Sequence, residues 1–447
     1  MLEALVFLVR KFKEGHSMGQ SAGREAYTSS GNENQNGQLV NDIKTMFERS
    51  KAPSVECHIN RVPNHLRMVN AKAYTPMFIS IGPFHHFNEK LQTAEKHKVK
   101  YVKSFMERNE VETNLESLVS TIRGMEESIY YCYEETISFS MHSDAFVKMI
   151  LMDAIFIIEL FLRYDNNSMK SDDPILGSQW MYPIMMLDLV LLENQLPFFV
   201  IEKLFNLAFP NHSNSLPLIE HTFKFFDCFN LQKMEPKDVK IDHFTDLYRT
   251  FYRLPPSSQP KGRTDTDRLK YSATQLKEAG VKFKVNPKKF LLDLNFDSKK
   301  GVLDMPCLRL YDQTEAFFRN VMALEQFLDE ENQCITEYFI FLDFLINTTE
   351  DVYLLCNNGI VVNYLGDNEA AKHVVNNLNI NISCPNINAN YSGICKDLNA
   401  FYEKRCHKYM ATLWHDYLNT PWRIASTIAA FVLLVLTFIQ TVFSILH

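Results

Sequence analysis

The longest uninterrupted run of apolar positions lies at the end of the chain. Residues 424–446 read IASTIAAFVLLVLTFIQTVFSIL, with no charged residue and no proline. As an α-helix this run would be about 34 Å long, sufficient to cross the ~30 Å hydrocarbon core of a bilayer. Its Ile, Leu, Val and Phe residues together favour insertion by about 4 to 8 kcal/mol. The pattern predicts one transmembrane helix at 424–446, within a membrane anchor that covers 419–447.

Two internal segments, 145–163 and 181–205, are equally rich in large apolar residues, but both carry charges. Asp153 lies near the middle of the first, and a central Asp costs about 2.5 to 3.5 kcal/mol in a bilayer. The second segment contains four charged residues and is interrupted by Pro197. Both are therefore predicted to be buried helices of a folded domain, with 194–197 as a bend between two packed helices.

The rest of the chain divides into a polar N-terminal segment and a long region of mixed pattern. Residues 15–40 are rich in Gly, Ser and Asn and show no apolar period, so 1–40 is predicted to be disordered. Residues 41–418 are predicted to form a predominantly helical domain. A candidate sub-boundary lies near 255–267, where PPSSQPKGRTDTD is typical of a loop or linker.

Within this domain, apolar periodicity predicts helices at 89–109 and 313–345. Residues 290–310 differ, because apolar residues alternate with polar ones on both sides of a turn that contains Gly301. This alternation predicts a small β-hairpin. The expected fold class is mainly α: a multi-helix globular domain with a small β-hairpin element and a single C-terminal transmembrane helix.

The charges that flank the apolar run predict its orientation. Arg405, His407, Lys408 and Arg423 precede it, whereas only His447 follows it. Because cytosolic flanks are enriched in basic residues, the main domain is expected to face the cytosol, as in a tail-anchored protein. The alternative is an extracellular or luminal domain. It would be marked by glycosylation of the Asn-x-Ser/Thr sequons at Asn166, Asn211, Asn347, Asn381 and Asn390.

Composition bears on three further features: nucleic-acid binding, disulfide formation and metal binding. The net charge is 46 − 53 = −7, so no overall basic field is available to bind nucleic acid. The nine cysteines are odd in number and irregularly spaced, which is typical of reduced thiols. Cys395, Cys406 and His407 come closest to a metal cluster but lack the usual ligand spacing, so no metal site is predicted.

A histidine pair, His85 and His86, follows the Gly82-Pro83 turn in ISIGPFHHF. Such a pair can bind a metal or transfer protons, and Glu95 and His97 lie nearby in sequence. The chain has no HExxH motif, no third ligand at helical spacing and no carboxylate placed to orient either ring. The favoured interpretation is that both histidines cap or pack the turn.

Four carboxylates, Asp153, Glu159, Asp188 and Glu193, lie in the two apolar segments, and buried carboxylates can mark catalytic sites. Their spacings of six and five residues do not place either pair on one helical face. Arg163 or Arg319 is expected to pair with them in buried structural contacts.

No motif predicts a nucleotide, a cofactor or a small-molecule substrate, since GxGxxG, GxxxxGK[ST] and GxSxG are all absent. No catalytic, cofactor-binding or metal-binding residue is therefore assigned, and the protein is not expected to be an enzyme.

Several strings resemble the plant family known as Domain of Unknown Function 247, whose members are UPF0481-type proteins. The resemblance covers the chain from about residue 41 to its end. The strings are Arg61-Val62-Pro63, AYTPMFISIGPFHH (73–86), EKHKVKY (95–101), LDLVLLENQLPFFVIEKLF (187–205), ATQLKEAGVKFK (273–284), GVLDMPCL (301–308), TEAFFRNVMALEQ (314–326) and NTPWRIASTIAA (419–430).

The resemblance implies a plant protein with a helical domain, a small β element and a C-terminal membrane helix, and no catalytic activity is established for the family. It also suggests a role in self-incompatibility or other reproductive recognition. The sequence therefore predicts a single-pass membrane protein that contacts the bilayer through its C-terminal helix and recognises an unidentified protein partner. The alternative is an unrecognised enzyme that uses His85 and His86 with the buried carboxylates.

Overall fold

The computed structural model describes residues 37, 39–41, 44, 59–133, 142–166, 173–210, 216–237, 239–254, 262–265, 268–286, 290–328, 331, 333–404 and 421–446. The chain divides into two units, Met1–Ser54 and Val55–His447. Most of the segment predicted to be disordered, 1–40, lies outside the described residues, as does much of the candidate sub-boundary at 255–267.

Helix α6 (Ser143–Asp165) forms the centre of the first part of the folded region. Fourteen of its 23 residues are buried, because it is apolar on nearly every face. The helices α4, α5, α9 and α10 all pack against it. This confirms the buried helix predicted at 145–163. The helices before residue 260 are α3 (Asn64–Arg67), η1 (Ala71–Tyr74), η2 (Glu89–Leu91), α4 (Gln92–Met106), α5 (Leu115–Tyr131), α6, α8 (Met181–Asp188), α9 (Phe198–Ala208), α10 (Leu218–Phe225) and α11 (Phe244–Thr250).

Residues 181–205 form two helices, as predicted, but the connection between them is longer than the predicted bend at 194–197. Helix α8 ends at Asp188, and α9 begins only at Phe198, with Pro197 as its N-cap. The nine residues between them, 189–197, are turns and extended chain, and all of them are buried. The long connection has a structural role, because its polar groups bind other segments of the domain.

The β structure is larger than the predicted hairpin. The hairpin itself is confirmed: β3 (Asn295–Asp297) and β4 (Val302–Met305) pair antiparallel, with Phe296 opposite Leu303. A third strand, β2 (Lys282–Val285), pairs parallel with β4, so the sheet order is β2-β4-β3. Two further two-stranded sheets join distant segments. They pair β1 (Arg263–Asp265) antiparallel with β7 (Asn386–Asn388), and β5 (Leu308–Leu310) parallel with β6 (Val361–Asn363).

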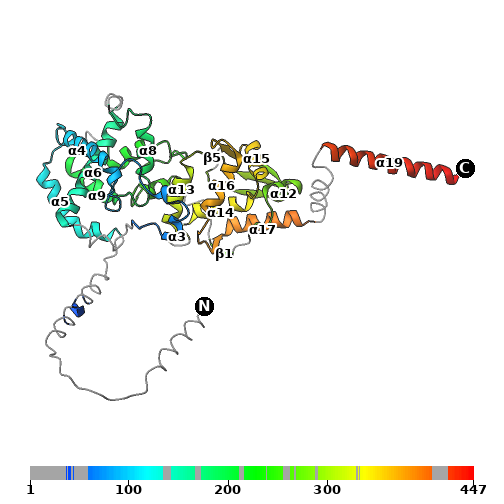
Figure 1. Ribbon diagram of the computed structural model, residues 1–447, viewed down its shortest axis with the longest axis horizontal. Coiled ribbons are helices and arrows are strands. Elements are labelled where there is room, and N and C mark those ends of the chain that lie inside the picture. The colour runs from blue at the N-terminus through cyan, green and yellow to red at the C-terminus, as the bar shows by residue number, and fades with distance from the viewer. Residues whose placement is uncertain are drawn as a thin grey trace, which may run out of the picture. The chain divides into compact units, whose positions relative to one another are not determined.

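Helix α13 (Thr314–Glu325) links the earlier helices to the later ones. It packs against η1 and α11 on one side and against α14 and α16 on the other. In Figure 1 it lies between the group that contains α4, α6 and α9 and the group that contains α12, α14 and α17. One apolar core runs from Ile59 to Phe401 through both groups. The remaining helices are α12 (Ala273–Glu278), α14 (Cys334–Leu345), α15 (Thr349–Asn357), α16 (Asn368–Leu378), α17 (Ala389–Glu403) and α19 (Pro421–Leu446).

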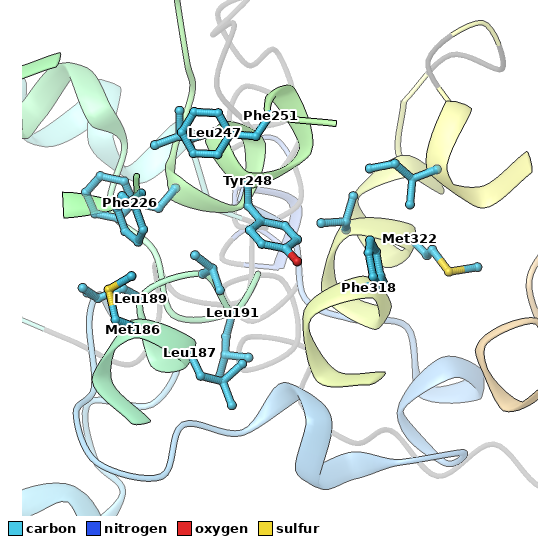
Figure 2. Packing of buried hydrophobic residues seen from close by; sticks show 14 of the residues in the cluster. Met186, Leu187, Leu189, Leu191, Phe226, Leu247, Tyr248, Phe251, Phe318 and Met322 are labelled. Carbon is cyan, nitrogen blue, oxygen red and sulfur yellow. The ribbon is translucent and has the colours of Figure 1, made fainter. Parts of the chain in front are cut away.

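Figure 2 shows how this core is built where α11 faces α13. The Tyr248 ring extends from α11 toward the helix that carries Phe318 and Met322. Met186 and Leu191 come from α8 and from the connection that follows it. All five side chains are buried or nearly so.

Helix α19 is the 26-residue element that the apolar run predicts. Its stretch from Trp422 to Phe443 is long and apolar enough to cross a membrane, and none of it is buried in the protein. Phe431, Leu434 and Phe438 are 67%, 69% and 70% exposed. The apolar helix α6, by contrast, is enclosed by its neighbours.

Candidate functional site

The turn that carries the two histidines is bound to the connection between α8 and α9. The Asp188 carboxylate accepts hydrogen bonds from the backbone N–H groups of Met77, Phe78 and Ile79 at 2.9, 2.7 and 2.9 Å. Asn194 accepts from the Ile81 N–H at 2.7 Å and donates to the Ile79 carbonyl at 3.0 Å. Two segments more than a hundred residues apart are therefore joined through polar side chains with short, buried bonds.

Gly82 is the point at which the histidine turn comes closest to the connection between α8 and α9. Its φ is +72°, and a Cβ there would lie 2.5 Å from the Gln195 carbonyl oxygen, so a side chain cannot be accommodated. The same carbonyl accepts a hydrogen bond from the Tyr133 hydroxyl at 3.0 Å. The Gln195 side chain accepts from the Phe244 N–H at 2.8 Å, which ties the connection to the start of α11.

Beneath the turn lies a fully buried ion pair. The Gly82 N–H donates to Asp153 at 2.8 Å, and the other oxygen of that carboxylate lies 2.6 Å from the Lys98 ammonium. Glu95 lies 2.6 Å from the same ammonium. Burial lowers the pKa of Lys98, but the two carboxylates outweigh it and the pKa is raised. Lys98 therefore stays protonated and holds α4 to α6.

The structure places a carboxylate beside one of the two histidines, a proximity that the sequence did not predict. Glu193, 108 residues away, brings Oε2 to 3.4 Å from His85 Nε2. It also forms an ion pair with Arg67 and accepts from the Val62 N–H at 2.7 Å. Burial raises the pKa of Glu193, but His85, Arg67 and the Val62 N–H lower it by more. The net pKa is therefore below its ordinary value, and the carboxylate is ionised at neutral pH. Among the described residues, no ion pair involves His86.

The remaining acidic candidate, Glu159, is held by two arginines. Arg108 binds it through two nitrogens at 2.6 and 3.2 Å, and Arg163 binds it at 2.7 Å. The contact between Arg163 and Glu159 confirms the predicted pairing, and Arg163 also reaches Asp173 at 2.7 Å. Arg319, the alternative partner named for these carboxylates, instead pairs with Glu315 at 2.7 Å on its own helix. In α13 these two residues are one helical turn apart, which favours that local pair.

The other histidine and cysteine candidates are not part of the contact between the histidine turn and the connection that follows α8. His97 is 6.0 Å from Phe78, ring centre to ring centre, and burial lowers its pKa. Cys395 is buried in α17. Cys406 and His407 lie outside the described residues. Within the described ranges, no group of three His, Cys, Asp or Glu residues is placed to hold a metal ion.

Sequence reasoning missed a cavity of about 390 Å³ between α8, α11 and α13. Its wall is largely aromatic and comes from segments spread over more than a hundred residues of the chain. No local pattern could reveal it, since each contributing side chain is also consistent with an ordinary core residue. It is lined by Tyr182, Pro183, Met186, Cys228, Phe229, Leu231, Tyr248, Tyr252, Leu291, Cys307, Leu308, Arg309, Tyr311, Gln313, Thr314, Phe317 and Phe318.

These features define the class: a mainly helical domain whose buried polar groups join distant segments, followed by one apolar helix long enough to span a membrane. The sequence profile of the plant proteins of unknown function designated DUF247 matches residues 59–436. The chain therefore belongs to that family, as the quoted strings predicted.

Two relatives in Arabidopsis thaliana bear the family name UPF0481. One is 29% identical over 419 residues, which cover 87% of this chain and 86% of the relative. The other is 21% identical over 491 aligned positions, covering 88% and 91%. No solved structure matches the chain.

Proposed function

We propose that this protein is a membrane-tethered recognition protein, in which α19 crosses a bilayer and the domain 59–404 binds a protein partner. The observation that carries the tether is the exposure of α19. No residue from Trp422 to Phe443 is buried, although most are large and apolar. Each such side chain gains about 1.5 to 3 kcal/mol when it leaves water, which a lipid bilayer supplies along the whole helix.

The folded domain is proposed to face the cytosol. Arg423 lies at the start of α19, and three further basic residues precede it in sequence. Basic residues concentrate on the cytosolic flank of a transmembrane helix. A luminal domain is the competing topology. Asn166, Asn347, Asn381 and Asn390 are exposed, so a glycosidase-sensitive change in mass would support it and contradict the cytosolic one.

The proposed recognition role rests on the contacts that the four buried carboxylates make within the protein. Asp153, Glu159, Asp188 and Glu193 each hold two or more groups of the protein itself. A carboxylate committed to ion pairs and backbone N–H groups stabilises the fold and is poorly available for proton transfer. Binding rather than catalysis is therefore the activity that this arrangement favours. The family resemblance suggests that this binding serves reproductive recognition, which stays a prediction.

Membrane extraction tests the tether. Full-length protein and a version that ends at Thr420 would each be expressed in plant cells, and the membranes washed with alkaline carbonate. We expect the full-length chain to stay in the pellet and the shortened chain to be released. Release of both in equal measure would show that α19 does not insert.

Proximity labelling from the domain tests recognition. A labelling enzyme fused before residue 59 should mark a reproducible set of cytosolic neighbours in intact cells. The matched control is the same fusion to α19 alone, which reports neighbours of the membrane only. Identical sets from the two fusions would contradict a specific partner for the domain.

A second candidate function, catalysis at the histidine turn, is favoured by one observation. His85 Nε2 lies 3.4 Å from Glu193 Oε2, close enough for the carboxylate to attract a protonated imidazole. The double replacement of His85 and His86 by Ala separates the two roles. Loss of biological function with an unchanged melting temperature and unchanged neighbours would support catalysis. A lower melting temperature would show that His85 serves the fold.

A further inference from the structure

The cavity between α8, α11 and α13 has the walls of a small-molecule site. Tyr248 from α11 and Phe317 from α13 stack with ring centres 5.2 Å apart, and Phe229 meets each of them at 5.0 Å. Tyr252 contacts Phe318 at 5.5 Å. The volume of about 390 Å³ lies at the lower end of the roughly 300 to 1,000 Å³ of known ligand pockets. A compact molecule of one or two rings is small enough to enter it.

The exposure of the lining residues shows which end opens to solvent. Met186, Tyr248, Leu308, Thr314 and Phe318 are buried and form the inner wall. The exposed lining residues form the rim and are Pro183, Cys228, Leu231, Arg309, Tyr311 and Gln313. At the rim, Tyr311 is held by Tyr364 of the segment after β6, and their rings stack at 4.6 Å with an angle of 4° between the planes.

Two tyrosine hydroxyls lie in the wall of the cavity. The Tyr248 and Tyr252 hydroxyls lie 3.1 Å apart. Burial raises the pKa of both, that of Tyr252 to about 12, so both keep their protons at neutral pH. Arg309 is the one charged residue in the lining, and no carboxylate among the described residues pairs with it. The site is therefore apolar inside, with hydroxyl donors in its wall and a single positive charge at its rim.

We propose that this cavity binds an aromatic carboxylic acid, with the ring system packed against the aromatic wall that contains Phe229, Tyr248 and Phe317 and the carboxylate at Arg309. An arginine binds a carboxylate through two parallel N–H bonds, and the lining offers no acidic group to repel it. Aromatic walls take a flat ring in stacked or edge-on geometry. This site lies in the folded domain and does not depend on the membrane tether.

The proposal is tested with two ligands of nearly the same shape, the anion 2-naphthoate and the neutral 2-naphthamide. Each is titrated calorimetrically into the full-length protein in lipid nanodiscs, with empty nanodiscs as the reference for partition into lipid. We expect saturable binding of one naphthoate per chain, at least about tenfold tighter than the amide, because only the carboxylate meets Arg309 as an ion.

Three variants locate the binding. Arg309→Gln should weaken naphthoate about tenfold and leave the amide unchanged, since Arg309 is exposed and its loss spares the core. Lys277→Gln, at an exposed position of α12 that does not line the cavity, is the matched control and should change neither. Cys228→Trp fills the rim and should abolish binding of both ligands.

Four outcomes would overturn the proposal. They are no saturable binding by 1 mM, equal affinity for the two ligands, an Arg309→Gln variant that binds like the native chain, and a Cys228→Trp variant that still binds. If Cys228→Trp does not fold, Leu231→Trp at the 64% exposed rim position replaces it, and binding retained in that variant would count equally against the site.

Discussion

The Lys98 ammonium lies 2.6 Å from the Asp153 carboxylate, and both side chains are completely buried. The pair joins α4 to α6 directly below the turn at Gly82, whose N–H completes the coordination of Asp153. A buried charge is tolerated only when its partner stays in place. The histidine turn therefore rests on an electrostatic contact between two helices.

Lys98→Met should destabilise the protein by about 3 to 5 kcal/mol, because it leaves the Asp153 charge buried with one N–H donor. Asp153→Asn should cost less, since Lys98 keeps Glu95 as its partner. The double variant removes both charges and should recover part of the loss. Denaturant unfolding of the four proteins in nanodiscs measures this cycle. If the double variant equals the sum of the single losses, the two residues are not coupled.

Asp188 predicts a dependence of stability on pH. Burial raises its pKa to about 6, although three backbone N–H groups oppose the shift. An unfolded Asp has a pKa of about 3.9, so between pH 4 and 6 the folded state binds more protons than the unfolded state. The contribution of Asp188 to the free energy of unfolding therefore falls as the pH rises, by at most about 1.4 kcal/mol per unit.

Comparison with Asp188→Asn isolates this effect, because Asn does not titrate. The difference in unfolding free energy, native minus variant, should decrease from pH 4.5 to 6.5 and be constant above pH 7. A constant offset is also expected, since the amide nitrogen of Asn cannot accept from the N–H groups of 77–79. A difference that stays flat across the whole range would show that Asp188 keeps an ordinary pKa.

The parts of the fold that the sequence predicted are those determined by local pattern. Helix α6 and helix α19 are both long apolar runs, and the charges in α6 distinguish a buried helix from one that is long and apolar enough to span a membrane. The hairpin β3–β4 is marked by Gly301, whose φ is +64° and whose added Cβ would meet the Phe401 ring at 2.7 Å. In each case, residues close together in the sequence are sufficient to predict the element.

What the sequence did not predict depends on contacts between distant residues. Glu193 reaches His85 only because 189–197 is an extended, buried connection, whereas its apolar composition resembles a helix. The strand β2 has four residues, too few for alternation to be recognised, and its partner β4 follows only after β3. The aromatic cavity draws on α8, α11, β5 and α13, so no single segment contains its pattern.

Two glycine replacements should have opposite effects. Gly82→Ala places a methyl 2.5 Å from the Gln195 carbonyl at a φ of +72°, so it should destabilise the domain by about 2 kcal/mol or more. Gly124 lies in α5 with open space around it, so Gly124→Ala should stabilise by about 0.5 to 1 kcal/mol. Thermal unfolding of both variants checks this. A tolerated Gly82→Ala would contradict the close approach of the turn to the connection.

A charge placed at two depths of α19 tests how the helix meets the bilayer. Leu436→Asp puts a carboxylate near the middle of the Trp422–Phe443 stretch, where it costs about 2.5 to 3.5 kcal/mol in lipid. Thr427→Asp puts the same group near one end, where water and headgroups reach it and the cost is smaller. Resistance to carbonate extraction should fall strongly for the first and little for the second. A helix that lies on the membrane surface would lose binding according to which face carries the charge. Equal losses for the two variants would contradict a spanning helix, in which the cost of a charge depends on its depth.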